Sequence, residues 1–214
     1  EVVLLMAESS PSRPKSRRQW LRVAIHAGAL APLAYLAWEY ARGDFFVAPI
    51  AEMLTRTGRT GLYLLLITLA CTPIYILTGW REAVRVRRTV GLYSFFYVAL
   101  HLLIFLGWDY GFAWGLIWRA MVAQPYVIAG LAAFLILLAL AVTSTRRWQQ
   151  RLGKRWIWLQ RGIYLAAALD ILHVLWLSKA PQQTIRYAVI LGILLLIRLP
   201  PIRKNIVKLR RKLV

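Results

Sequence analysis

Six long apolar segments make up most of this 214-residue chain, and they decide what it can fold into. The segments are residues 20–40, 61–80, 90–108, 126–145, 156–177 and 185–200. Most reach the roughly 20 residues that a helix needs to cross a hydrocarbon core of about 30 Å. Because a backbone in lipid must form its hydrogen bonds within itself, the segments are predicted to be helices. The predicted fold class is therefore all-α, an integral membrane bundle of six transmembrane helices.

Basic residues give the chain a formal net charge of +20, and they are unevenly placed. If the six helices alternate in direction, 19 of them lie on one side of the membrane and six on the other. The 19 are Arg13, Lys15, Arg17, Arg18, Arg81, Arg85, Arg87, Arg88, Arg146, Arg147, Arg151, Lys154, Arg155, Arg203, Lys204, Lys208, Arg210, Arg211 and Lys212, and the six are Arg42, Arg56, Arg59, Arg119, Lys179 and Arg186. Because positive residues are retained in the cytoplasm, both termini are predicted to be cytoplasmic. Anionic lipids are the expected partner of this charge, and no nucleic acid is expected.

This pattern divides the chain into three parts. Residues 1–19 are a basic head that is predicted to be disordered, residues 20–200 the membrane bundle, and residues 201–214 a basic cytoplasmic tail. Met6 is the expected natural start, with residues 1–5 as an upstream extension, and no cleavable secretory signal is expected. The outer connections are predicted at residues 43–59 and 109–125, the second with a short helix along the membrane surface. Cys71, the single cysteine, is predicted to be free and buried.

The three histidines all lie inside apolar segments, where an imidazole needs a partner. At ~1.5 Å per residue, His101 lies about 16 Å and His173 about 25 Å from the cytoplasmic side, so helix tilt must bring them level. For a single histidine, an interhelical hydrogen bond is the simpler interpretation. Two at comparable depth favour axial ligation of a haem iron between two helices, with electrons as the cargo. Ser94, Gly162 and Ala166 share their faces and leave room either for a macrocycle or for direct helix contact.

The remaining polar residues in the segments have more than one interpretation. His26, near the inner end of the first segment, could bond a carbonyl, ligate a second haem or contact a quinone. Asp170 is the only acid deep in a segment, and it could orient the His173 imidazole or pair with Arg186. Arg161 and Arg198 are expected to extend to the nearby membrane edge. No solenoid-type repeat is visible.

Several stretches of the chain resemble a known family. They are TGRTGLYLLLITLACTP (57–73), RRTVGLYSFFYVALHL (87–102), QPYVIAGLAAF (124–134), TSTRRWQQRLGKRWIWLQRGIYL (143–165) and HVLW (173–176). In these stretches the chain is similar to the MsrQ (YedZ) family, the haem-binding membrane subunits of a bacterial periplasmic protein-methionine-sulfoxide reductase. That family belongs to the ferric-reductase-like transmembrane group, which includes the NADPH oxidases. The resemblance implies the bacterial inner membrane, and haem b with His101 and His173 at the matching ligand positions. It also implies electron delivery from the quinone pool to a periplasmic molybdopterin subunit, and an association with FMN.

The chain departs from this family at one position. Relatives often carry a further histidine where this chain has Gln160, roughly 20 Å inward of His173, and an amide is a poor haem ligand. The corresponding inner position of the third segment holds Arg87 or Arg88. One haem is therefore expected, and a second would need His26 or an unusual ligand. Gln160, Arg87 and Arg88 stay predicted cofactor contacts, because the two cations could attract haem propionates, quinone oxygens or a flavin phosphate.

The predicted function is that of an electron conduit with no catalytic residue of its own, the substrate chemistry being expected on the partner subunit. The electron donor is a quinol or a cytoplasmic flavin reductase. Three alternatives are open at this point. They are a stand-alone ferric or quinone reductase of the same fold, a proton-coupled transporter that uses Asp170, His173 and His101, and a structural membrane anchor.

Overall fold

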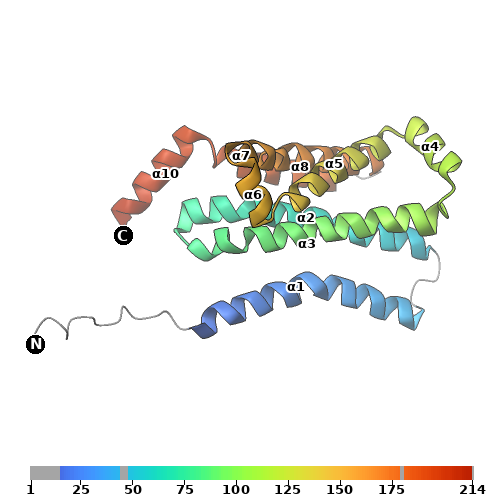
Figure 1. The fold of residues 1–214 in the computed structure, drawn as a ribbon, viewed down its shortest axis with the longest axis horizontal. Coiled ribbons are helices and arrows are strands. Elements are labelled where there is room, and N and C mark those ends of the chain that lie inside the picture. Colours follow the sequence, from blue (N-terminus) through green and yellow to red (C-terminus); the bar gives the residue numbers. More distant parts are fainter. Residues whose placement is uncertain (1–14, 44–47, 179–180, 214) are drawn as a thin grey trace, which may run out of the picture.

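A computed structural model describes residues 15–43, 48–178 and 181–213. These residues form helices and the turns that join them. The helices are α1 (Lys15–Arg42), α2 (Pro49–Thr78), α3 (Arg81–Ile104), the π-helical turn η1 (Phe105–Asp109), α4 (Trp114–Ala123), α5 (Pro125–Val142), α6 (Arg146–Leu152), α7 (Lys154–Gln160), α8 (Gly162–Leu177), α9 (Pro181–Leu196) and α10 (Pro200–Leu213). Figure 1 shows three layers: α1 alone, then α2 beside α3, then the helices from α5 onward.

Four described helices are long and apolar enough to cross a membrane: α1 from residue 19, α2, α3 continued by η1, and α5. A fifth would be α9 with α10, which together are bent by 71° at residues 197–199. The all-helical, multi-pass prediction is therefore confirmed for the described part of the chain. The predicted fifth segment is divided at Arg161 into α7 and α8, and α8 alone has only 16 residues. The predicted sixth segment ends earlier than expected, since α9 stops at Leu196.

Helix α2 begins at Pro49, twelve residues before the predicted span. The prediction of an outer loop over residues 43–59 was therefore wrong from residue 49 onward, and residues 44–47 lie outside the described residues. The polar side chains of this turn are satisfied locally. Arg56 bonds Glu52 one turn back and Glu39 of α1, and the Thr57 hydroxyl donates to the carbonyl of Met53. Because these groups do not need water, the helix continues through them.

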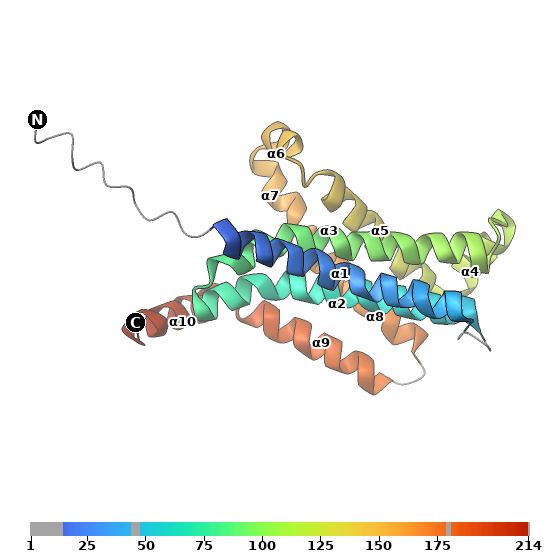
Figure 2. The same ribbon diagram turned by 90° about the horizontal axis from the view of Figure 1, so that it is seen from below.

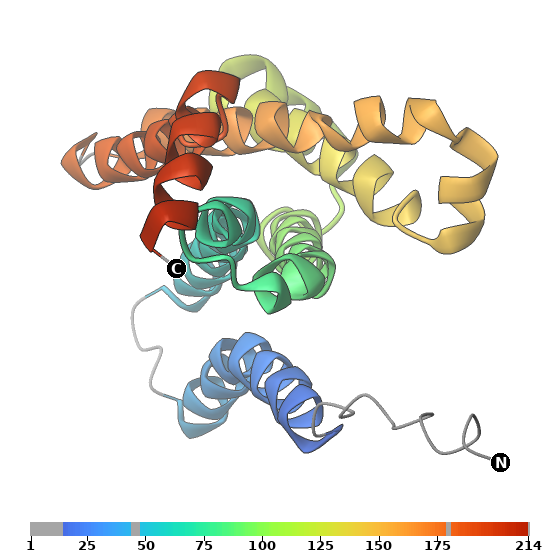
Figure 3. The same cartoon turned by 90° about the vertical axis from the view of Figure 1, so that its left-hand side faces the viewer.

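The core lies where α2 and α3 meet α5 and α8. Leucines of α2 pack against small and branched residues of α8, and the most buried of them are Leu62, Leu65, Leu69, Ala166 and Ala167. Seen from one end, α2 and α3 run side by side under α5 and α8, with α1 on the opposite side (Figure 3). Cys71 is free and buried within this core, as predicted.

The most buried hydrogen bonds between helix α1 and the bundle are made by one tyrosine of α3. The Tyr97 hydroxyl of α3 donates to the Ala29 carbonyl at 2.7 Å and accepts the Leu33 amide at 3.1 Å. These two backbone groups are one helical turn apart, beside Pro32, which has no amide hydrogen to donate. Figure 2 shows α1 lying along α2 and α3 over its whole length.

The ends of the chain differ in part from the prediction. Helix α1 begins at Lys15, so the last residues of the predicted disordered head are helical, while residues 1–14 lie outside the described residues. The predicted basic tail forms helix α10. The short helix predicted between residues 109 and 125 is present as α4. The start of α1, the α2–α3 turn, the α6–α7 hairpin and α10 all lie toward the same end of the bundle (Figure 1), so most of the basic residues gather there.

Candidate haem site and inner pocket

The structure brings His101 of α3 and His173 of α8 together. Their ring centres lie 6.2 Å apart and their planes are almost perpendicular, at 87°. The depth difference expected from the sequence does not remain, so tilt and the break at Arg161 bring the two rings to one level. His26 is not part of this pair, since it bonds the Tyr93 hydroxyl at 2.7 Å.

Each imidazole is held at Nδ1 by a backbone carbonyl of a neighbouring helix. His101 bonds the Leu54 carbonyl of α2 at 2.9 Å, and His173 bonds the Tyr126 carbonyl of α5 at 2.7 Å. A carbonyl can only accept, so Nδ1 carries the hydrogen in both rings. The lone pair is therefore on Nε2, the nitrogen free to bind a metal. This is the usual way in which a metal-binding histidine is oriented.

The spacing of the rings fits an axial pair on haem iron. A metal–imidazole bond of about 2 Å, with roughly 1.1 Å from nitrogen to ring centre, places two opposed rings about 6 Å apart. The observed 6.2 Å matches this value. Two protein ligands are enough where the metal brings its other ligands with it, as haem iron does. Among the described residues, no group of three or more His, Cys, Asp or Glu lies together to hold a bare ion.

Two glycines lie against the rings, and the sequence analysis did not find them. A Cβ atom on Gly58 would lie 3.1 Å from His101 Nδ1, and one on Gly130 would lie 2.8 Å from His173 Nδ1. Each glycine stands four residues after the carbonyl that its histidine bonds. Both histidine–carbonyl pairs are also separated by 47 residues along the chain.

This equal spacing is an internal repeat. Leu54, Gly58 and His101 each have a counterpart 72 residues later, at Tyr126, Gly130 and His173. The pair α2–α3 is thus matched by the pair α5–α8. A search for a glycine at a fixed distance before each histidine would have revealed the pattern, but only with the knowledge that residues 49–59 are helical.

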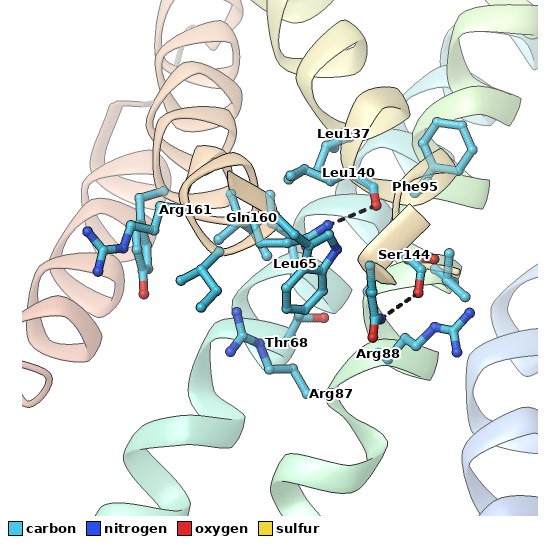
Figure 4. Close-up of a pocket in the computed structure, with 18 of the residues that line it drawn as sticks. Leu65, Thr68, Arg87, Arg88, Phe95, Leu137, Leu140, Ser144, Gln160 and Arg161 are labelled. Atoms are coloured by element: carbon cyan, nitrogen blue, oxygen red, sulfur yellow. Dashed lines mark hydrogen bonds between the residues drawn. The ribbon is translucent and has the colours of Figure 1, made fainter. Parts of the chain in front are cut away.

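A pocket of about 480 Å³, called the inner pocket below, lies between the same helices on the side of the α6–α7 hairpin (Figure 4). It also follows the repeat, because Leu65, Thr68 and Arg88 line it together with their counterparts 72 residues later, which are Leu137, Leu140 and Gln160. Arg87 and Arg161 add further positive charge. None of the described residues that line it is acidic. The structure therefore gathers three predicted cofactor contacts, Arg87, Arg88 and Gln160, at one site.

Comparison with known proteins agrees with this geometry. The ferric reductase like transmembrane component family matches residues 57–171. The protein-methionine-sulfoxide reductase heme-binding subunit MsrQ of Rhodospirillum rubrum is 44% identical over 189 residues, which cover 87% of this chain and 91% of that protein. The chain belongs to the MsrQ family. The subunit of the same name from Xanthomonas axonopodis pv. citri is 42% identical over 181 residues, covering 81% of this chain and 83% of that protein.

This MsrQ family member has Gln160 where a histidine was expected. The Gln160 side chain forms hydrogen bonds with the end of α5. Its amide nitrogen donates to the Leu140 carbonyl and to the Thr143 hydroxyl, both at 3.3 Å. Gln160 thus ties α7 to the end of α5 (Figure 4). It lines the pocket with its side chain already bonded.

Asp170 and Arg198 do not form the interactions that were predicted from the sequence. The Nδ1 of His173 bonds the Tyr126 carbonyl, so Asp170 does not orient that ring. Asp170 Oδ2 is shielded and has no hydrogen-bond partner among the described residues, and the expected ion pair with Arg186 is not formed there. Arg198 does not extend to the membrane edge but turns into the bundle. It donates to the Tyr164 hydroxyl and the Leu69 carbonyl, both at 2.5 Å.

Proposed function

We propose that this chain is the haem b electron-transfer subunit of a methionine-sulfoxide reductase system. The observation that carries the proposal is the His101–His173 pair, with rings 6.2 Å apart and both Nδ1 atoms held by carbonyls. The 44% identical relative is named a heme-binding subunit of protein-methionine-sulfoxide reductase, which supports the same assignment.

In this proposal His101 and His173 would hold the haem iron. Haem b supplies one-electron transfer when it is bound. The chain holds the imidazoles in place through the Leu54 and Tyr126 carbonyls, which leaves both Nε2 atoms free to bind the iron. The surrounding helices exclude water, because His101 and His173 lie between α2, α3, α5 and α8 and not at a loop.

Six crossings of the bacterial inner membrane complete the proposal, with both termini in the cytoplasm. The supporting observation is that the segments richest in Arg and Lys gather at one end of the bundle, since positive residues are retained in the cytoplasm. α7 with α8 forms the fifth crossing and α9 the sixth. The haem site then lies in the outer half and the pocket in the inner half.

The inner pocket is the proposed point of electron entry. Arg87, Arg88 and Arg161 give it positive charge around apolar walls, which suits a flat donor that carries oxygen anions. A quinol of the membrane pool or the FMN of a flavin donor has this character. No histidine is among the described residues that line the pocket, and the amide of Gln160 is already bonded. A second haem here is therefore not proposed. His26, bonded to Tyr93, is not among the residues that line this pocket and stays only a predicted cofactor contact.

The electron acceptor is proposed to be a periplasmic molybdopterin-containing methionine-sulfoxide reductase subunit. It would dock on the outer end, where α4, η1 and the start of α2 lie within about two helical turns of His101. This chain then performs no substrate chemistry itself, which is why no catalytic residue is assigned.

Difference spectra of the dithionite-reduced protein test the ligands. His101→Ala and His173→Ala should each lose the low-spin haem bands, whereas His26→Ala should keep them. Full retention of the bands in both of the first two variants would overturn the assignment.

To separate this function from a stand-alone ferric or quinone reductase, the reduced protein is mixed with a periplasmic methionine-sulfoxide reductase subunit. Reoxidation that requires the partner supports the proposal.

One observation favours a second candidate, a proton-coupled transporter. The buried Oδ2 of Asp170, which has no hydrogen-bond partner within the described part of the chain, lies one turn before His173, as a proton relay would require. In both histidines, however, Nδ1 is hydrogen-bonded to a carbonyl, so only Nε2 is left to exchange a proton. Haem-free protein that remains folded and moves protons would favour the transporter.

A further inference from the structure

Gly58 and Gly130 each lie where an added side chain would touch the imidazole of His101 or His173. His101 reaches the Leu54 carbonyl and His173 the Tyr126 carbonyl, and each glycine is the residue one turn later on the same face. In an α-helix, the Cβ of that later residue tilts back toward the helix N-terminus. A group that bonds the earlier carbonyl from the side therefore lies under this Cβ.

We propose that Gly58 and Gly130 are positioning residues which keep the two Nδ1–H···O=C bonds short and thereby set the reduction potential of the haem. This rests on the proposed function, because it requires His101 and His173 to ligate iron. It goes further in assigning a tuning role to two residues that touch neither haem iron nor substrate.

The contact distances show how closely an added Cβ would approach each imidazole. A Cβ at position 130 would lie 2.8 Å from Nδ1 and 3.0 Å from Cε1 of His173, which is inside van der Waals contact. At position 58 the corresponding distances to His101 are 3.1 and 3.2 Å. An imidazole bound to iron at Nε2 and to a carbonyl at Nδ1 cannot rotate away. It can only move off the helix, which lengthens the hydrogen bond.

Lengthening that bond has an electronic result. An imidazole that donates a short hydrogen bond from Nδ1 carries more negative charge on Nε2 and is a more basic ligand. A more basic axial ligand stabilises ferric over ferrous iron, so the short bonds lower the reduction potential. An added methyl group at position 130 or 58 should therefore raise it. The effect should be larger at position 130, where the contact is closer.

The chain offers two matched controls. Gly61, also on α2, has a Cβ contact of 2.8 Å, but with Val98 Cγ2 and not with an imidazole. Gly61→Ala thus introduces a comparable clash without touching a ligand. Gly192 of α9 has no atom within 4 Å of its Cβ position, so Gly192→Ala controls for the change of helix propensity alone.

The experiment is a potentiometric titration of the haem in purified, haem-loaded protein: wild type, Gly130→Ala, Gly58→Ala, Gly61→Ala and Gly192→Ala. The expected result is a positive shift of the midpoint for Gly130→Ala, a smaller positive shift for Gly58→Ala, and no shift for the two controls. Loss of haem from Gly130→Ala alone, with haem retained in Gly61→Ala, would also support the proposal.

The proposal is overturned if the midpoints of Gly130→Ala and Gly58→Ala shift no more than that of Gly61→Ala. If Gly130→Ala does not fold, the milder Gly58→Ala against Gly61→Ala decides the matter alone. A wild-type protein that binds no haem would instead reject the proposed function, so the two failures are distinguishable.

Discussion

The imidazole planes of His101 and His173 stand at 87° to each other, and the cause lies in the helices around them. Each ring is fixed by a carbonyl on a different neighbour, His101 by α2 and His173 by α5. Neither ring can rotate without losing its bond, so the perpendicular arrangement is built into the scaffold.

This angle predicts a spectroscopic signature. When two axial imidazole planes are perpendicular, the two iron orbitals that interact with the rings are nearly equal in energy. The ferric haem should then give a highly anisotropic low-spin signal in electron paramagnetic resonance. An ordinary rhombic low-spin spectrum would mean that the rings are close to parallel when haem is bound.

The attachment of α1 through Tyr97 predicts a stability effect without a haem effect. Tyr97→Phe removes the hydroxyl that joins the Ala29 carbonyl and the Leu33 amide, and with it two hydrogen bonds between α1 and α3. A hydrogen bond contributes about 0.5–1.5 kcal/mol net, so thermal unfolding in detergent should shift to lower temperature. Tyr63→Phe, which removes only an exposed hydroxyl pair with Tyr187, is the control and should have little effect. An equal loss in both variants would contradict the role of Tyr97.

The inner pocket predicts a kinetic effect of its arginines. Replacing Arg88 or Arg87 by Gln should slow haem reduction by a quinol or a flavin reductase about tenfold to a hundredfold, since a lost charge-assisted hydrogen bond is worth about 1.5–3 kcal/mol. The dithionite-reduced spectrum should stay unchanged, because the haem ligands are untouched. Arg85→Gln is the matched control, as Arg85 pairs with Glu82 on the same helix and does not line the pocket. If Arg85→Gln slows reduction as much, general surface charge and not the pocket is responsible.

The sequence predicted much of this architecture, and its failures have physical causes. Apolar length and the two histidines were enough to predict a helical membrane protein with His101 near His173. The first turns of α2 were missed because Glu52, Arg56 and the threonines look like a loop, although Arg56 pairs with Glu52 and the threonine hydroxyls bond backbone carbonyls one turn earlier. That error concealed Leu54, whose carbonyl bonds His101, and Gly58, which lies beside that ring.

Arg198 shows a second limit of the sequence. A cation near a segment end is expected to extend outward to water. Here the chain bends by 71° between α9 and α10, and this bend directs the Arg198 guanidinium inward to the Tyr164 hydroxyl and the Leu69 carbonyl. The direction of a side chain at a helix break depends on the angle of the break, which periodicity does not encode.

Helix α10 supports a prediction about lipids. Ile202, Ile206 and Leu209 form one stripe along it, and Ile202 and Leu209 are exposed and not packed in the bundle. Figure 3 shows α10 crossing the end of α2, where Arg210 donates to the carbonyls of Tyr75 and Ile76. An apolar stripe with a basic opposite face is typical of a helix that lies in the headgroup layer.

Anionic lipid should therefore stabilise the protein through α10, by about 1 kcal/mol per basic residue near the surface. Replacing Arg203, Lys204 and Lys208 by Gln should abolish most of the rise in unfolding temperature that phosphatidylglycerol gives over phosphatidylcholine in nanodiscs. The rise in wild type should also shrink as salt is added, because salt screens exposed charges. The same triple change on the α6–α7 hairpin, at Arg146, Arg147 and Arg151, removes equal charge and leaves α10 intact. Since α6, which carries these three arginines, exposes no large apolar side chain among its described residues, an equal loss there would mean that net charge, and not the position of α10 on the membrane, governs lipid binding.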